Sequence, residues 1–168
     1  VNRAWLLAHE SDALQDKIKA DFESLLARRL LGEPIAYILG QREFFGLNLI
    51  VTPDTLIPRP DTETLVETAL DKIPTDTPFT VLDLGTGTGA VALAIAEHRP
   101  EAQVTAIDAS SGALDIAKRN ANQLDLTQVD FRLPVEMQLA HHVLQPLRTQ
   151  LIGDLRGDDV RAVHEGFR

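Results

Sequence analysis

The sequence predicts an α/β fold, a doubly wound parallel sheet preceded by a small helical domain and a β-hairpin linker. Three observations predict it. Apolar runs of strand length alternate with helical patterns over residues 79–133, an order typical of parallel sheets with right-handed crossovers. Apolar residues recur at helical spacing within residues 1–40. Residues 41–57 contain two short strand-like segments around a glycine.

The first forty residues are expected to be helical. Apolar side chains recur every three or four residues from Leu14 to Leu30, which predicts one helix with an apolar stripe. Ser11 is a favourable N-cap for this helix, and Gly32 and Pro34 predict its end. We interpret the segment as a helix packed within its own small bundle rather than as a ligand site.

A stiff segment follows the predicted hairpin. Two prolines flank Arg59 within residues 57–63. Each proline fixes its own φ and disfavours helix just before it, so the backbone around the arginine is held in one direction. On composition alone, Arg59 is a surface residue in a linker that leads into a helix.

The remaining strands and helices alternate as an α/β sheet requires. Their predicted N-caps are polar residues, and their predicted strands are apolar runs. In order, we expect a helix capped by Asp61 or Thr62, a strand at 79–84, a helix at 89–98, a strand at 104–108, a helix capped by Ser110 or Ser111, and a strand at 128–133.

A glycine-rich turn follows the first strand of this sheet. Gly85, Gly87 and Gly89 recur at spacing two between an apolar strand and an apolar helix. Such a loop brings backbone N–H groups against a ligand at a helix N-terminus. Gly85, Gly87 and Ala90 also satisfy the dinucleotide fingerprint, so the glycines alone leave NAD open as a ligand.

Two acidic residues bear on that choice. Asp83 lies two residues before Gly85, where its carboxylate would face an incoming pyrophosphate. The same carboxylate suits a cationic cofactor without phosphate, namely S-adenosylmethionine, whose amino group it can receive. Asp108 ends the next strand and is placed to accept ribose hydroxyls in either ligand class. The structural alternative is that both acids only cap the helices that follow.

The amino-acid composition limits the classes of partner and ligand that we expect. The net charge is −9 and no segment is basic, which argues against nucleic acid as the main partner. The absence of cysteine excludes disulfides and thiolate metal sites, and no two histidines have the spacing of a helical metal site. No apolar run is long enough to span a membrane and no signal-peptide pattern is present. We expect a cytoplasmic monomer without a metal.

Four segments, taken in order, resemble one known family, the peptide chain release factor glutamine methyltransferases (PrmC/HemK). The resemblance covers about residues 1–133. The glycine loop marks only the methyltransferase class, whereas the first and third segments are far more specific. The segments are GEPIAYILG at 32–40, EFF at 43–45, IPRPDTE at 57–63 and DLGTGTG at 83–89.

The resemblance implies a helical substrate-recognition domain at 1–40, a hairpin linker at 41–57 and a Rossmann-like class I methyltransferase domain at 58–168. It implies methyl transfer from S-adenosylmethionine to the side-chain amide nitrogen of the glutamine in the Gly-Gly-Gln motif of release factors. It also places Arg59 beside the cofactor, replacing the surface interpretation. The implied cofactor-binding residues are Arg59, Asp83, Gly85, Thr86, Gly87, Thr88, Gly89 and Asp108.

One family motif is absent. The family holds its substrate amide with an Asn-Pro-Pro-Tyr segment, and none of the four asparagines here precedes a proline. Catalytic residues are therefore unassigned. Either a stretch is missing between Leu133 and Pro134, with 137–147 and 158–167 matching later helices, or the motif is deleted. We favour the first, because deletion would remove strands from a buried sheet. An adenine amino methyltransferase and a non-catalytic fragment remain alternatives.

Overall fold

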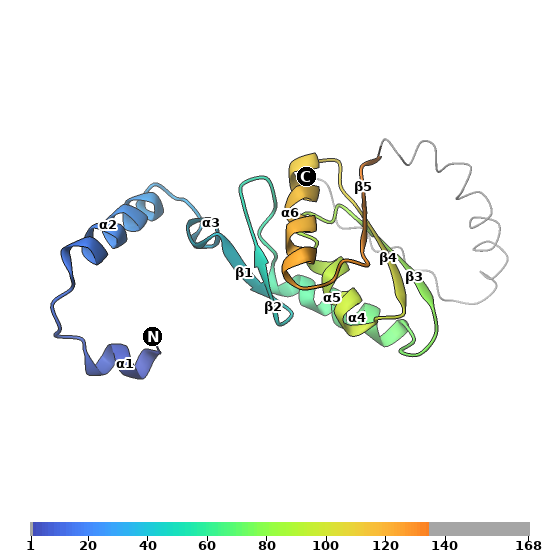
Figure 1. Ribbon diagram of the computed structural model, residues 1–168, viewed down its shortest axis with the longest axis horizontal. Helices are drawn as coiled ribbons and strands as arrows, with labels where there is room; N and C mark the ends of the chain where they lie inside the picture. The colour runs from blue at the N-terminus through green and yellow to red at the C-terminus, as the bar shows by residue number, and fades with distance from the viewer. Residues whose placement is uncertain (1, 135–168) are drawn as a thin grey trace. The chain divides into compact units, whose positions relative to one another are not determined.

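The computed structural model describes residues 2–134 and divides the chain into two units. The first unit ends at Leu39 and the second begins at Gly40 (Figure 1). The helices expected at 137–147 and 158–167 lie outside the described residues.

The first unit contains three helices, α1 (Arg3–Ala8), α2 (Asp16–Leu30) and α3 (Ile35–Leu39). The predicted N-cap at Ser11 is wrong, because α2 begins five residues later. The backbone N–H of Asp12 donates instead to the carbonyl of His9 at 3.1 Å, so this stretch belongs to the turn that ends α1. Gly32 has φ +92° and ends α2 as predicted.

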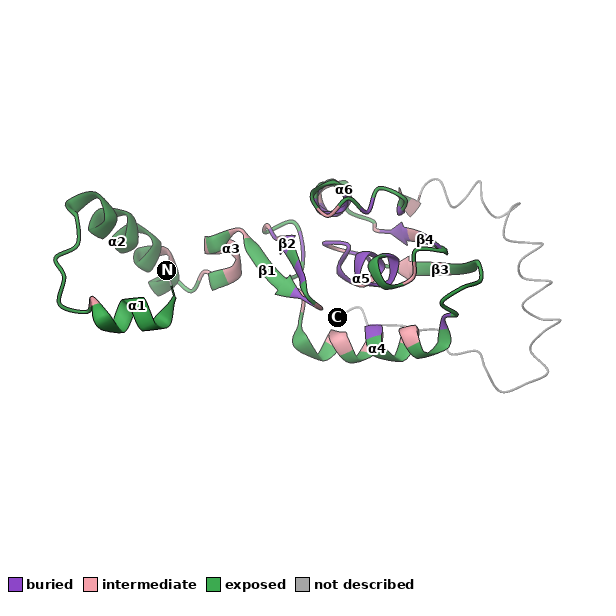
Figure 2. Ribbon diagram, turned by 60° about the horizontal axis from the view of Figure 1, so that its bottom comes forward, coloured by how far each residue is buried: buried purple, intermediate pink, exposed green. Residues whose placement is uncertain are grey.

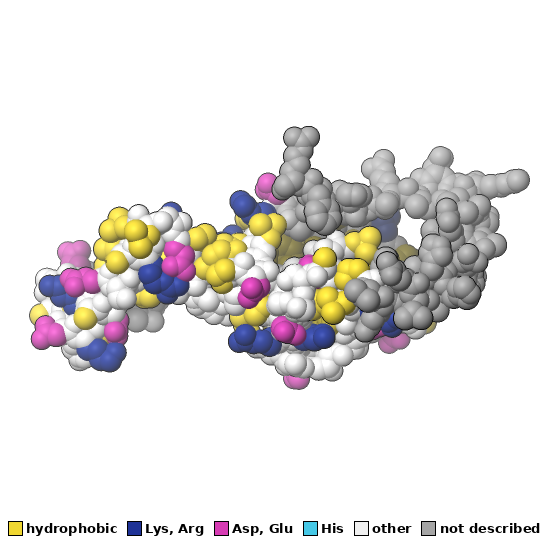
Figure 3. Space-filling model, turned by 90° about the horizontal axis from the view of Figure 1, so that it is seen from above, with side chains coloured by type: hydrophobic (Ala, Val, Ile, Leu, Met, Phe, Trp, Pro, Cys, Tyr) yellow, Lys and Arg dark blue, Asp and Glu magenta, His cyan; other side chains and the backbone are white. Residues whose placement is uncertain are grey.

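The apolar side chains of the helical unit are exposed. None of the residues of α1, α2 and α3 is buried (Figure 2). Phe22 is 60% exposed and Leu30 is 79% exposed, and hydrophobic side chains gather on the surface of this unit (Figure 3). The expectation that the α2 stripe packs within its own bundle is therefore wrong for the residues that the structure describes.

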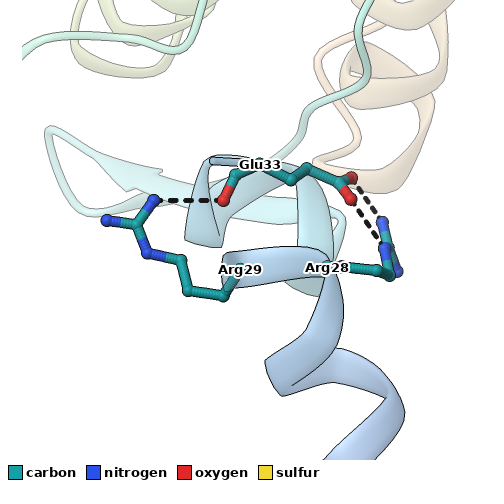
Figure 4. Close-up of polar contacts among 3 residues, drawn as sticks. All are labelled: Arg28, Arg29 and Glu33. Carbon is teal, nitrogen blue, oxygen red and sulfur yellow. Dashed lines mark hydrogen bonds and ion pairs between the residues drawn. The ribbon is translucent and has the colours of Figure 1, made fainter. Parts of the chain in front are cut away.

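The turn between α2 and α3 is fixed by the Gly-Glu-Pro-Ile segment (Figure 4). The Arg28 guanidinium donates from Nε and Nη2 to the two carboxylate oxygens of Glu33, at 2.7 and 2.5 Å. Arg29 donates to the Glu33 carbonyl at 3.1 Å. These hydrogen bonds from Arg28 hold the pKa of the Glu33 carboxyl below its ordinary value. The motif thus has a structural role at this turn.

The second unit starts with the predicted hairpin, strands β1 (Gln41–Phe44) and β2 (Leu47–Ile50), paired antiparallel. Phe45 and Gly46 both have positive φ, the requirement of a tight type I′ turn. The Phe45 N–H donates to Glu63 Oε1 at 3.2 Å. Glu63, the last residue of the segment at 57–63, therefore attaches the start of the next helix to the hairpin turn.

That helix, α4 (Glu63–Lys72), follows a short 3₁₀ turn, η1 (Pro60–Thr62). The predicted side-chain cap at Asp61 or Thr62 is wrong, because neither N-terminus has a side-chain cap bond. Pro60 starts the 3₁₀ turn, so Thr62 is helical rather than extended, and an N-cap needs extended backbone.

The parallel sheet has the order β3-β4-β5, with strands β3 (Phe79–Leu84), β4 (Ala102–Ile107) and β5 (Asp130–Arg132). Helix α5 (Ala90–His98) connects the first two strands, and α6 (Ser111–Gln123) connects the last two. The alternation is as predicted, and β5 is shorter than expected. Ser110 caps α6 by accepting from the Ala113 N–H at 3.1 Å.

The helices α4, α5 and α6 lie together on one face of this sheet (Figure 1). Each helix contributes buried side chains, such as Val66, Leu93 and Ala121, to one core with Val104 and Ala106 of β4. Val81 of β3 packs against this core. On the opposite face of β3, Leu82 is 49% exposed and Leu84 is 62% exposed. None of the helices in the described part of the chain is both long and apolar enough to cross a membrane.

Candidate functional site at the glycine loop

The loop between β3 and α5 depends on its glycines for two different reasons. Gly85, Gly87 and Gly89 have φ of +80°, +55° and +82°, which other residues adopt only with strain. A Cβ on Gly85 or Gly87 would meet nothing within 4 Å, so these two glycines border open space. A Cβ on Gly89 would lie 3.3 Å from the Ala117 Cβ, so Gly89 allows α5 and α6 to pack closely.

The backbone N–H groups of this loop are mostly used within the protein. The expectation that the loop presents its amides to a ligand is therefore wrong for four of its residues. Gly85 and Thr86 both donate to the Ile107 carbonyl at 2.8 and 2.9 Å, Gly87 donates to Asp108 Oδ2 at 2.8 Å, and Gly89 donates to the Thr86 carbonyl at 2.8 Å.

The carboxylate of Asp83 lies at the N-terminus of α5. It accepts a hydrogen bond from Thr86 Oγ1 at 2.6 Å and another from the Ala92 N–H. A helix N-terminus attracts one anion, and here the protein supplies that anion itself. A pyrophosphate would meet a carboxylate in this position, which argues against a dinucleotide and in favour of a cationic ligand.

Burial is the largest influence on the pKa of Asp83. Loss of solvent raises the pKa of the Asp83 carboxyl above its ordinary value. The hydrogen bonds from Thr86 and Ala92 oppose this rise, and the neighbouring Asp108 carboxylate adds to it. A nearby positive charge would therefore relieve an unfavourable negative charge at this site.

Asp108 joins the loop to the next helix. Its Oδ2 accepts from the Gly87 N–H at 2.8 Å, and its Oδ1 accepts from the Ser110 N–H at 2.9 Å. Asp83 thus makes the capping contact of the structural alternative, whereas Asp108 bonds the loop and the N-cap residue Ser110 and caps no helix itself. Each carboxylate oxygen has more than one lone pair, so these contacts leave Asp108 able to accept further hydrogen bonds from a ligand.

The remaining predicted site residues are two buried threonines of the loop and the exposed Arg59. Thr86 and Thr88 are buried, and the Thr86 hydroxyl is directed to Asp83. Arg59 is exposed between its prolines, and within residues 2–134 its guanidinium has no hydrogen bond or ion pair. The structure thus brings Asp83, Asp108 and the loop together, without a direct bond from Arg59. Within the described residues, no acidic or histidine cluster is arranged to hold a metal ion.

One residue of the site was missed by the sequence analysis. Asn120 of α6 is fully buried and its side chain bonds to the loop carbonyl of Thr88. The available signal was a polar residue on the apolar face of a helix, between Ala117 and Ala121.

Comparisons with known proteins match both units. A family model described as the PrmC N-terminal domain matches residues 1–40, and one described as a methyltransferase domain matches residues 76–146. The release factor glutamine methyltransferase of Bordetella pertussis is 54% identical over 123 residues, 73% of this chain and 46% of that protein. The Escherichia coli protein of the same name is 48% identical over 127 residues, 76% and 46% of the two chains.

Over these residues, the chain belongs to the release factor glutamine methyltransferase family. The resemblance inferred from sequence motifs is thereby confirmed. The fold is the Rossmann-like α/β fold of class I methyltransferases, preceded by the helical region of this family. The chain spans about half the length of the curated relatives that it matches.

A solved structure gives a more distant match. A SAM-dependent methyltransferase from Agrobacterium tumefaciens is 27% identical, with a TM-score of 0.44, over 55% of this chain and 30% of that protein.

Proposed function

We propose that this chain binds S-adenosylmethionine at the glycine loop. The observation that carries the proposal is the Asp83 carboxylate at the N-terminus of α5, where it accepts from Thr86 and Ala92. That position repels a phosphate and attracts an ammonium or sulfonium group. Membership of a methyltransferase family supports the same ligand.

The residues around the loop fit this cofactor chemically. The Asp83 carboxylate would offset the positive charge, and Asp108 would accept hydrogen bonds from the ribose with its spare lone pairs. The open space at Gly85 and Gly87 would let adenosine approach the backbone. The full proposed set of cofactor-binding residues is Arg59, Asp83, Gly85, Thr86, Gly87, Thr88, Gly89 and Asp108.

We further propose the family reaction, methylation of the side-chain amide nitrogen of the glutamine in the Gly-Gly-Gln motif of a release factor. S-adenosylmethionine would supply the methyl group from its sulfonium sulfur, which keeps the bonding electron pair and becomes a thioether. The amide nitrogen forms the new bond and loses one proton. An amide is a weak nucleophile, so the protein's part is to orient it. The residues that orient it are unassigned, because the sequence lacks Asn-Pro-Pro-Tyr.

A second candidate function is cofactor binding without methyl transfer. None of the four asparagines lies in an Asn-Pro-Pro-Tyr segment, which holds the substrate amide in this family. The two acids proposed to bind the cofactor, Asp83 and Asp108, are both present. A protein with the donor side alone would bind cofactor and leave the release factor unmodified.

One experiment separates these functions. Binding of S-adenosylhomocysteine is measured by calorimetry, and labelled S-adenosylmethionine is then offered with purified release factor or with DNA. Binding with label on the Gly-Gly-Gln peptide supports the family reaction. Binding without transfer to either supports the second candidate. Label on DNA alone, or NAD binding in place of S-adenosylhomocysteine, overturns the proposal.

A further inference from the structure

Asn120 is a polar side chain in the middle of the apolar core. It projects from α6 and has no exposed surface. Burying an amide is unfavourable unless all of its hydrogen-bonding groups are satisfied, so a fully buried asparagine indicates specific partners. Its partners lie 70 and 32 residues away in the sequence.

The amide is satisfied by two other segments of the chain. Its Oδ1 accepts from the Ile50 N–H at 2.7 Å. Its Nδ2 donates to the Ile50 carbonyl at 3.1 Å and to the Thr88 carbonyl at 2.9 Å. Both amide hydrogens are thus used. The opposite orientation would direct the oxygen at two carbonyls, so the network allows only one.

These bonds join the hairpin to the glycine loop. Ile50 is the last residue of β2, and its two backbone groups pair with Asn120 as they would with a neighbouring strand. Thr88 immediately precedes Gly89, the N-cap of α5. Fixing the Thr88 carbonyl fixes the peptide plane that also carries the Gly89 N–H, which donates back to the Thr86 carbonyl.

We propose that Asn120 is a positioning residue, which holds the glycine loop in its binding conformation and couples that loop to the end of the hairpin. Asn120 acts through the Thr88 peptide and not by touching the ligand. The effect on binding rests on the proposed function, because it requires the loop to hold the cofactor. The effect on the loop backbone does not depend on the proposed function.

The test compares two substitutions on α6. Asn120→Asp keeps the size and the acceptor oxygen and removes at least one of the two donors, because a carboxyl group has one O–H when protonated and none when ionised. Gln123→Ala is the matched control, because Gln123 Nε2 donates to the Asn48 carbonyl at 3.1 Å and so links α6 to the hairpin without reaching the loop. Amide hydrogen exchange at Gly89 and Ile50 is measured without ligand, and S-adenosylhomocysteine affinity by calorimetry, both well below the melting temperature.

Asn120→Asp is expected to lower the protection of the Gly89 amide and to weaken binding about tenfold, the effect of losing a buried positioning hydrogen bond. Gln123→Ala is expected to leave both unchanged. Unaltered Gly89 exchange in a folded Asn120→Asp protein overturns the proposal. If the parent protein binds S-adenosylhomocysteine, an unchanged affinity in Asn120→Asp also overturns the proposal.

Two further measurements separate the possible failures. If the parent protein does not bind S-adenosylhomocysteine, the proposed function fails, and the Gly89 exchange still decides the role of Asn120. If Asn120→Asp does not fold, Asn120→Ser, which keeps a single donor, takes its place. Restored Gly89 protection in Asn120→Ser relative to Asn120→Ala supports positioning, and equal exchange in the two contradicts it.

Discussion

At the scale of single residues, Asp83 is the group expected to make ligand binding depend on pH. Burial raises the pKa of its carboxyl. The folded protein therefore holds this proton more tightly than the unfolded chain does, and the stability that the protonated group contributes is lost as pH rises through the raised pKa. Ligand binding has the opposite sign, because a cation beside the site favours the ionised carboxylate and releases the proton.

We predict that affinity for S-adenosylmethionine falls as pH decreases through the raised pKa of Asp83. Asp83→Asn is expected to weaken binding by about tenfold or more, as expected for loss of a charged partner, and to remove this pH dependence. Calorimetry across the acidic range measures both effects. Asp115→Asn, which changes an exposed acid on α6, is the control. A pH-independent affinity in the parent protein would contradict the prediction.

A substitution at Gly89 distinguishes the cost of backbone strain from the cost of close packing. We predict that Gly89→Ala lowers the free energy of unfolding more than Gly40→Ala does. Both residues have positive φ, which costs alanine about 1–2 kcal/mol. Only at Gly89 would the new Cβ approach Leu93 and Ala117, at 3.1 and 3.3 Å, and overpacking costs a further ~1–3 kcal/mol. Urea denaturation measures the difference in the free energy of unfolding between the two variants. Equal losses would show that α6 moves away from the new Cβ at no cost.

At the scale of elements, α6 depends on its N-cap. Ser110→Ala should lower the free energy of unfolding by about 1 kcal/mol, because the Ala113 N–H loses its acceptor. Ser111→Ala changes the first helical residue and should stay within about 0.5 kcal/mol of the parent protein. Chemical denaturation of the pair decides which serine caps the helix, and a larger loss at Ser111 would be incompatible with the observed cap.

The elements were predictable where apolar patterns are strong. The strand at 79–84 was predicted with its observed bounds, because a short apolar run between turns has few other solutions. The bounds of the strands predicted at 104–108 and 128–133 differ from the observed ones by one or two residues, and the larger errors lie at helix starts. Ser11 and Thr62 are both good capping residues, but the turn at His9 and the 3₁₀ turn at Pro60 determine where the helices begin. Such local competition cannot be read from residue preference alone.

The candidate site was predictable in part for a similar reason. Asp83 and the three glycines stand in one local pattern, and Asp108 could be added because it follows the next predicted parallel strand. The structure brings these residues together at one end of the sheet. The use of the loop amides and the role of Asn120 were not foreseen. They depend on contacts with Ile107 and Ile50, far away in the sequence, which a local pattern does not encode.

At the scale of the whole molecule, the apolar surface exceeds what the described fold covers. The helical unit exposes its stripe, and the sheet exposes one face at Leu82 and Leu84. Contiguous exposed apolar surface is unusual in a soluble monomer and marks a place where something else packs. The chain also spans about half the length of its curated relatives. The exposed apolar surface of the described residues is expected to promote association in solution.

We predict that Leu84→Thr changes the free energy of unfolding of this chain by no more than about 0.5 kcal/mol, because the side chain has little to lose on an exposed face. Threonine has the β-branched shape that strands favour. The control, Leu93→Ala in the buried helix α5, should cost about 2–5 kcal/mol. Urea denaturation gives both values, and light scattering should show less association for Leu84→Thr. A loss of 2 kcal/mol or more at Leu84, similar to a core substitution, would mean that another segment or a second copy covers this face in solution.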